Sequence, residues 1–536
     1  MTDQKVASVL PAAKSGAWEP FKHPAFAVLW GATLVSNIGT WMHDVGAGWL
    51  MTELSPSPAV VAAVQAATTL PVFLFALPAG ALADIVDRRR LLITVNIFLG
   101  AVAALLAVLV SLSAVTPTLL LLITFAMGTG AAFMAPAWQA VVPQLVPREQ
   151  LISAVALNSM GINVSRAIGP ALAGFLIVAY GLTVPFAINA LSVLGIVAAL
   201  LWWRVPEAKQ STLPAETIVP AMIAGVRYAL HSAPLKATLL RAVAFFLFAS
   251  AFWSLLPLIA RHVLQGGAAL YGVLLACLGV GAVGGAVLLP KIKARLGADA
   301  TVKAATVGLA GVIILIALAP NAYLAGVATL LAGVCWISVV STLNVSAQVA
   351  LPNWVRARGL SIFMMVFFGS MTVGSLTWGN LASLVGISTT LIIAAAGALV
   401  AIPLTSRAKL NQGETLDLTP SLHWPTPIVD SELPNDRGPV AIQIAYEIDA
   451  ADKERFLDLM THLAEARRRN GAYGWSIMED AASPTRFVEC WQEASWLQHL
   501  RHHERVSGAD RVLQDEIAKL HRGAAPPTAV HMIAVR

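Results

Sequence analysis

Charged residues are scarce in this chain of 536 residues, where Asp, Glu, Lys and Arg together make up only 12%. Hydrophobic residues make up 57%, and the mean hydropathy is +0.73. A soluble protein carries about 25% charged residues, so the composition indicates a protein that crosses a membrane many times. The net charge of +6 is modest and spread over short loops, so nucleic acid is not an expected partner.

Cysteine is also scarce, and the three that occur are far apart. Cys277 and Cys335 lie in apolar runs, and Cys490 lies near the C-terminus. Such an odd, widely spaced set predicts neither a disulfide framework nor a cysteine zinc site. The chain has no recognisable nucleophile triad, Walker loop or HExxH motif. We therefore expect no enzyme activity, no cofactor, no metal and no ATP-driven transport.

Twelve apolar runs are long enough to cross a ~30 Å hydrocarbon layer as helices, in two groups of six. With this arrangement the Lys and Arg residues of the loops fall on one side, and only Arg261 falls on the other. Positive residues collect on the cytoplasmic side, so we expect a multi-pass protein of the cell membrane with both termini in the cytoplasm. The runs are 24–50, 59–83, 90–112, 118–139, 151–179, 184–204, 238–262, 269–290, 302–320, 322–345, 357–381 and 386–405.

The polar segments between and after these runs define the predicted domains. In the central loop, Ile218, Met222, Val226 and Leu230 recur every fourth residue, which indicates a short helix on the membrane surface. A loosely structured tether fits equally well. The domains are a cytoplasmic N-terminal tail (1–22), a six-helix bundle (23–204), a cytoplasmic central loop (205–236), a second six-helix bundle (237–405), a linker (406–438) and a soluble domain (439–536).

A short internal repeat supports two halves of similar construction. Residues 139–146 follow the fourth run and residues 348–355 follow the tenth, each with proline at the same position and arginine soon after. Two similar halves that enclose a central site are typical of transporters that expose the site to each side in turn.

The last hundred residues alternate between strand and helix patterns. The expected order is ferredoxin-like, and with the stretch Phe487–Trp491 followed by 496–503 it resembles antibiotic biosynthesis monooxygenase domains. That resemblance implies pairing into a dimeric barrel. A dimerisation or regulatory module is preferred, and a monooxygenase-like enzyme anchored by the membrane part stays the alternative. The predicted elements are strand 440–447, helix 452–469, strands 474–479 and 486–491, helices 495–503 and 511–521, and strand 530–535.

Histidines crowd one of these tail helices. A metal site would need convergent side chains and a carboxylate or cysteine partner, so the favoured interpretation is a solvated helix face. The residues are His499, His502 and His503, with His521 nearby.

Ionisable residues inside the twelve runs are few, and two stand out. Asp44 lies on one helical face with Thr33, Asn37 and Thr40, and Arg166 shares a face with Ser159, Asn163 and Pro170. Charges at membrane depth usually face a wet cavity or a partner. The hypothesis is that Asp44 gains and loses a proton during transport; the alternative is a solvated aspartate at the cavity mouth.

Two motifs resemble the major facilitator superfamily. Gly80, Asp84, Arg88 and Arg89 match its loop after helix two, although Ile85 and Asp87 replace a usual basic residue and glycine. The resemblance implies a cytoplasmic latch, whereas simple topological signals would explain the arginines alone. Gly169, Pro170 and Gly174 match the helix-five motif of exporters, although Ser165 and Ala173 replace usual glycines. Ordinary helix packing is the alternative there.

The expected fold is therefore an all-α membrane protein with 12 helices in two six-helix bundles, plus a soluble α+β ferredoxin-like domain. Residues 36–41, Trp49 and residues 55–58 extend the resemblance to enterobactin exporters and multidrug efflux proteins over about 20–405. It implies export of siderophores, drugs or metabolites by alternating access with proton antiport; import stays open. A nearly uncharged cavity suits an amphipathic organic substrate. Candidate lining residues are Asn37, Gln65, Thr68, Asn158, Asn163, Trp253, Trp336, Ser338, Thr342, Asn344 and Phe367.

Overall fold

The computed structural model describes residues 16–204, 218–318, 321–410, 416–425, 434 and 436–535. Eleven of the helices in these ranges are long and apolar enough to cross a membrane. One of them, α9 (Ala268–Leu318), is two helices that meet at Gly297, where φ is 75° and ψ is 174°. Glycine adopts this positive φ without the clash that a Cβ would cause. With α9 counted twice the described chain makes twelve crossings, so the predicted fold class is confirmed.

The first six crossings form the N-terminal bundle. Pro24, Pro58 and Pro117 each start a helix, a position where the missing N–H has no partner to lose. In this bundle α2 packs on α4, α3 on α6, and α1 on both α5 and α6. The helices are α1 (Pro24–Leu54), α2 (Pro58–Ile85), α3 (Arg88–Ser111), α4 (Pro117–Val141), α5 (Leu151–Tyr180) and α6 (Thr183–Trp202).

The other six crossings form the C-terminal bundle, in which α9 packs on α12. The two bundles meet where α5 runs along α9. The helices are α8 (Ala233–Leu258), which continues as a π-helix at Ile259–Val263, the two parts of α9, α10 (Ala322–Val349), α11 (Arg356–Val385) and α12 (Ile387–Leu404).

A second compact unit contains α7 (Ile218–His231), one end each of α8, α10 and α11, and all residues from Thr405 onward. The part of the central loop at 218–231 is therefore helical. Tyr228 donates its hydroxyl hydrogen to the carbonyl of Ala350, 2.9 Å away. His231 lies 2.9 Å from Glu465 of α13 (Lys453–Asn470). Thus α7 joins the loop between α10 and α11 to the C-terminal domain.

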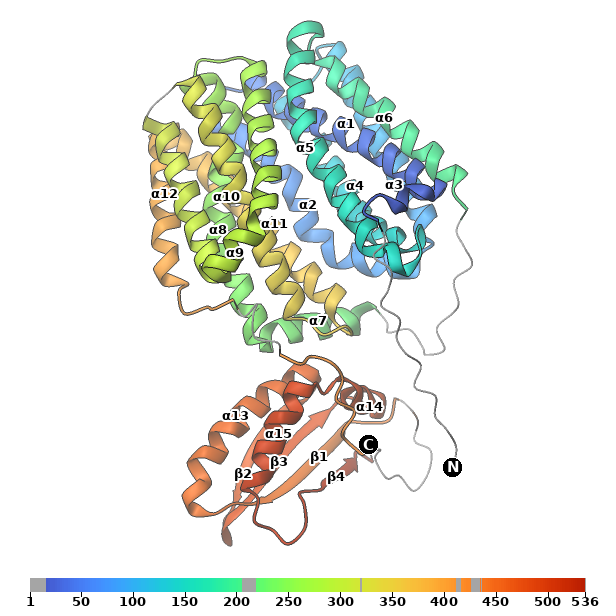
Figure 1. The fold of residues 1–536 in the computed structure, drawn as a ribbon, viewed down its shortest axis with the longest axis vertical. Helices are drawn as coiled ribbons and strands as arrows, with labels where there is room; N and C mark the ends of the chain where they lie inside the picture. The colour runs from blue at the N-terminus through green and yellow to red at the C-terminus, as the bar shows by residue number, and fades with distance from the viewer. Residues whose placement is uncertain are drawn as a thin grey trace. The chain divides into compact units, whose positions relative to one another are not determined.

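The C-terminal domain is a four-stranded antiparallel sheet in the order β2-β3-β1-β4. Helices α13 and α15 (Gly508–Leu520) cover one face of it (Figure 1). The side chains of Val440, Ile442 and Tyr446 alternate toward the buried face, as period-two patterning requires. The element order agrees with that expected from the sequence. The other elements are β1 (Val440–Glu447), β2 (Tyr473–Asp480), β3 (Ser483–Glu493), α14 (Trp496–Arg505) and β4 (Ala529–Ile533).

Part of the segment expected to be a linker is bound to this domain. Residues 416–425 run beside the start of α15, where Pro420 pairs with Ser507 and the backbone N–H of Gly508 donates to the carbonyl of Thr419. Trp424 donates its ring N–H to Gln514 of α15 at 2.8 Å. These contacts make residues 416–425 a strap on the domain.

Candidate substrate cavity

A cavity of about 260 Å³ lies among helices of both bundles. Eight helices contribute to its wall: α1, α2, α4 and α5 from the first bundle, and α8, α9, α10 and α11 from the second. The polar and aromatic residues that line it are Trp41, Asp44, Gln65, Thr68, Thr69, Thr124, Arg166, Trp253, Ser254, Tyr271, Trp336, Phe367 and Phe368.

The wall from the N-terminal bundle carries the charges. Asp44 of α1 is exposed to the cavity, and Arg166 of α5 stacks on the ring of Trp41, with 5.4 Å from the guanidinium carbon to the ring centroid. Asp44 and Arg166 face the same space, but among the described residues they form no ion pair. The Nε of Arg166 is buried without a hydrogen-bond partner in the described chain. Both charges are therefore available to something that enters the cavity.

The wall from the C-terminal bundle is aromatic. The ring of Trp336 lies 5.0 Å from Trp253 and 6.2 Å from Phe367, measured between centroids. Phe367 in turn lies 4.1 Å from the ring of Phe246. Rings held edge to face in this way form a stiff apolar surface. The cavity thus offers charge and hydrogen bonds on one side and aromatic faces on the other.

Sequence reasoning missed Trp41 and Tyr271 of this lining. Trp41 lies three residues before Asp44, so the helical face that contains Asp44 could have suggested it. Tyr271 is buried near the start of α9 and would lie 3.0 Å, through its hydroxyl, from a Cβ added at Gly48. No periodic signal marks Tyr271, because its place depends on how α1 and α9 pack.

Several predicted lining residues are not part of the wall of this cavity in the described structure. Asn158 accepts a hydrogen bond from the ring N–H of Trp138 at 3.2 Å, and Asn163 donates to the carbonyl of Ser159 at 2.9 Å. Ser338 donates to the carbonyl of Val334 at 2.7 Å. The remaining ones, which the cavity wall does not include, are half-buried Asn37, buried Thr342, and Asn344, which pairs with Gln348.

The glycine–proline motif of α5 lies where α1, α5 and α9 meet. A Cβ at Gly169 would lie 2.5 Å from the Cβ of Trp41, and one at Gly174 would lie 3.0 Å from the carbonyl of Ala268. Pro170 sits between them inside the helix. Glycine allows backbones to approach this closely, so Gly169 sets the contact of α5 with α1, and Gly174 sets its contact with α9 of the other bundle.

The loop between α2 and α3 contains Asp87, which replaces a usual glycine of the motif, and the predicted latch residue Arg89. Asp87 caps α3 by accepting from the backbone N–H of Arg90 at 2.7 Å. Arg89 donates to the carbonyls of Leu200 and Leu201, at 2.7 and 2.6 Å. Arg89 thus binds the C-terminal end of α6, where exposed carbonyls attract a cation.

The other predicted latch residues are Gly80, Asp84 and Arg88. Gly80 lies in the last turns of α2, and Arg88 is the first residue of α3. The side chain of Asp84 lies outside the described part of the structure.

The two bundles touch at the end of the cavity near the α1–α2 loop. Arg261 donates to the hydroxyl of Thr52 at 3.0 Å and stacks on Trp49 at 5.7 Å. The backbone N–H of Ala59 donates to the hydroxyl of Ser383 at 3.1 Å. Contacts between α1 or α2 and the second bundle therefore close this end.

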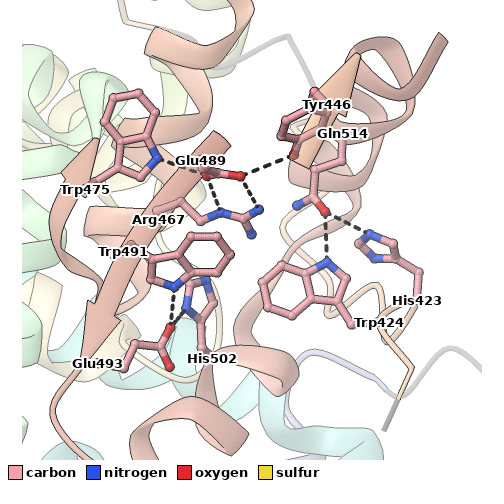
Figure 2. Close-up of polar contacts among 10 residues, drawn as sticks. All are labelled: His423, Trp424, Tyr446, Arg467, Trp475, Glu489, Trp491, Glu493, His502 and Gln514. Atoms are coloured by element: carbon pink, nitrogen blue, oxygen red, sulfur yellow. Dashed lines mark hydrogen bonds and ion pairs between the residues drawn. The ribbon is translucent and has the colours of Figure 1, made fainter. Parts of the chain in front are cut away.

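In the C-terminal domain, by contrast, the buried charges of Arg467 and Glu489 are paired with each other (Figure 2). Arg467 donates twice to Glu489, at 3.0 and 3.3 Å. Glu489 also accepts from Trp475 at 2.9 Å and from Tyr446 at 3.2 Å. Burial alone would lower the pKa of Arg467, but Glu489 raises it above its usual range. The network therefore keeps Arg467 ionised inside the domain.

The tail histidines were expected on a solvated helix face, and this expectation is wrong for two of them. His499 and His502 are both 1% exposed, and each places Nδ1 on a carboxylate oxygen of Glu493, at 2.9 and 2.5 Å. Burial alone would raise the pKa of Glu493, but His502 and His499 hold it below its usual range. Burial, with the neighbouring histidines, lowers the pKa of His503 to about 3. Helical periodicity could not reveal that α14 packs this face against β3.

Two bundles of six helices around a shared cavity define a membrane transporter of the major facilitator type. The chain belongs to the transmembrane secretion effector family, whose model matches residues 15–536. It is a multi-pass membrane protein that transports small molecules.

Curated relatives agree with this membership. The chain is similar to the staphyloferrin A transporter of Staphylococcus aureus, with 25% identity over 368 residues that cover 66% of this chain and 89% of the relative. It is also similar to macrolide efflux protein A of Streptococcus pyogenes, with 28% identity over 174 residues, which are 32% of this chain and 42% of that protein.

Solved structures support the fold alone, because their sequence identity is low. A POT family transporter in complex with 5-aminolevulinic acid matches with a TM-score of 0.59 and 13% identity, over 73% of this chain and 97% of that one. A bacterial homologue of the human lysosomal transporter Spinster matches with a TM-score of 0.58 and 15% identity, over 74% and 98%.

Proposed function

We propose that this protein exports small amphipathic organic molecules across the cell membrane by alternating access. The single observation that carries the proposal is the two-sided cavity, with Asp44 and Arg166 facing Trp253 and Trp336. An amphipathic molecule can place its rings or alkyl groups on the aromatic wall and its polar groups toward the charges. The names of the relatives, a siderophore transporter and a macrolide efflux protein, support molecules of this kind.

Export is driven by proton entry through Asp44 in this proposal. Asp44 is exposed to the cavity and makes no ion pair among the described residues, so nothing holds it permanently charged. A proton and a substrate that alternate at one site are coupled, because each shifts the protein toward the conformation that binds it better. The helix-five motif, with Pro170 and Gly174 against α9 and Gly169 against α1, supports export rather than import.

The conformation described is closed at the α1–α2 end. In the proposed orientation, the positively charged loops and both termini are cytoplasmic, so the α1–α2 end is the outer end. In the opposite state, the Gly80–Arg89 loop would latch the cytoplasmic end, with Asp84 on a helix N-terminus and Arg88 and Arg89 bridging to it. The engagement of Arg89 with α6 fits an unlatched state.

The experiment is transport by the purified full-length protein in liposomes with an imposed pH gradient. The compounds would include a macrolide and staphyloferrin A, the molecules in the relatives' names, together with simple amphipathic dyes. Accumulation that depends on the gradient and is absent from protein-free liposomes is the expected result. If the gradient drives no compound while a facilitated, downhill flux is present, the proton-driven export proposal fails.

A second copy of the chain is the proposed partner of the C-terminal domain. On the sheet face opposite α13, the side chains of Met478, Val530 and Met532 are exposed, and such apolar surface is typical of an interface. Light scattering of the detergent-solubilised full chain should report a dimer. Met532→Glu should convert it to a monomer, and Val512→Glu on exposed α15 should not. A wild-type monomer would contradict this.

A further inference from the structure

Three histidines of the C-terminal domain converge on one point, although they come from separate elements. His499 and His503 lie one turn apart on α14, and His531 lies on β4. Their metal-binding ring nitrogens all lie within 4.8 Å of one another. The rings of His499 and His531 are 4.7 Å apart between centroids. Because i and i+4 share a helix face, the fold directs all three imidazoles into one small space.

The distance between two of these histidines is close to that between two ligands of one metal ion. The two Nε2 atoms of His499 and His503 are 3.1 Å apart. Zinc–nitrogen bonds of about 2.0–2.1 Å in a tetrahedron place two ligand nitrogens roughly 3.3 Å apart. His531 needs only a small movement to complete the set, and its side chain is half-buried rather than locked in the core.

A buried carboxylate orients the central ligand. Glu493 is 1% exposed, and its Oε2 accepts from Nδ1 of His499 at 2.9 Å. This hydrogen bond leaves the lone pair of Nε2 directed at His503. A histidine held by a carboxylate in this way is the usual arrangement at protein metal sites, where the carboxylate fixes the ring and its tautomer. The same Glu493 accepts from Trp491 and His502, so its own position is fixed.

We propose that His499, His503 and His531 bind one divalent transition-metal ion in the C-terminal domain, with Glu493 as a positioning residue. Three neutral imidazoles suit zinc, copper, nickel or iron, whereas calcium and magnesium prefer oxygen ligands. Three protein ligands leave one tetrahedral position for water or a small ligand. Bound metal would tie the last strand, β4, to α14 and so tighten the end of the domain.

The test uses the purified full-length protein in detergent, carrying no polyhistidine tag, stripped with EDTA and titrated with Zn²⁺ or Co²⁺. We expect one ion per chain, a visible absorption from Co²⁺ bound to imidazole, and a higher Tm with Zn²⁺. His503→Ala and His531→Ala should each abolish stoichiometric binding. Glu493→Gln should weaken binding by about 10–100-fold. His462→Ala, an exposed histidine on α13 of the same domain, should bind like wild type.

A measurement on the wild-type protein guards against variants that fail to fold. Diethyl pyrocarbonate should modify His503 and His531 in the stripped protein, and Zn²⁺ should protect these two but not His462, as mapped by mass spectrometry. Binding that survives in both His503→Ala and His531→Ala, or equal modification with and without Zn²⁺, would overturn the proposal. The 3.1 Å contact would then be a simple hydrogen bond between two imidazoles.

Discussion

The membrane cavity and the C-terminal domain differ in how their charged side chains are paired. In the cavity, Asp44 and Arg166 face the same space without an ion pair between them in the described structure. In the C-terminal domain, the guanidinium of Arg467 is bonded twice to Glu489 and stacked between Trp424 and Trp491, at 4.9 and 4.2 Å from their centroids. Both regions contain a carboxylate and a guanidinium, but only in the C-terminal domain are the two groups bonded to each other.

This difference distinguishes charges expected to take part in transport from charges that stabilise the fold. A charge without a fixed partner costs stability, so it persists where a mobile partner such as a proton or a substrate makes use of it. A buried charge with all its hydrogen bonds made contributes mainly to a single folded arrangement. We therefore expect cavity variants to lose transport while keeping stability, and network variants in the tail to lose stability.

The largest effect is expected for Asp44→Asn. Removing the titratable carboxyl should reduce pH-driven transport to the level of empty liposomes, because no group remains to carry the proton. The Tm of the protein should stay within about 2 °C of wild type, since a surface-like substitution rarely costs more than ~0.5 kcal/mol. Glu53→Gln, on the same helix and bonded to Trp49, is the control that keeps transport. Gradient-driven transport by Asp44→Asn would contradict the proposal that the Asp44 carboxyl carries the proton.

Next in size is Glu489→Gln in the tail. Removing one partner of a buried ion pair leaves Arg467 uncompensated, which typically costs ~3–5 kcal/mol. Limited proteolysis and thermal unfolding of the full chain should show a destabilised C-terminal domain. Glu479→Gln, which removes an exposed pair with Lys453, should change little. Equal stability of Glu489→Gln and wild type would mean that the network is not structural.

Trp336→Ala tests the aromatic wall and should have a smaller effect. Loss of stacking against a substrate ring costs about 0.5–1.5 kcal/mol, which at its upper end corresponds to about tenfold weaker binding. Equilibrium binding of a fluorescent amphiphile would measure this change. Trp202→Ala, a tryptophan exposed at the end of α6, is the matched control. Unchanged affinity in Trp336→Ala would remove that ring from the site.

The smallest effect is expected when both members of the tail pair become apolar. Arg467→Met combined with Glu489→Leu removes the charges together, and such replacements are often neutral in the free energy of unfolding. The double variant should therefore be more stable than Glu489→Gln in the same unfolding assay. A double variant as unstable as the single one would show that packing, not unpaired charge, explains the loss.

Much of the fold could be predicted from the sequence, because hydrophobic run length and strand periodicity are local signals. The twelve crossings follow from runs such as 59–83, and the tail elements from alternation such as that of 440–447. The candidate cavity was harder. Asp44 and Trp336 stand out by residue type, whereas Tyr271 reaches the cavity only through the packing of α9 against α1.

Contacts between distant segments also explain why the histidine cluster and the strap of the C-terminal domain could not be predicted from the sequence. His531 is far from His499 in the chain, and the two meet only when β4 pairs with β1. The strap at 416–425 has the composition of a tether, and its binding to α15 depends on single partners such as Trp424 and Gln514. Interactions between distant segments leave no periodic trace in the sequence.

Simultaneous recording of substrate and proton movement tests the central claim most directly. Liposomes that contain the full-length protein and a trapped pH-sensitive dye would receive an amphipathic substrate without an imposed gradient. Wild-type protein should move protons against the substrate, and Asp44→Asn should move none. Substrate flux with no accompanying proton flux in the wild type would contradict the account.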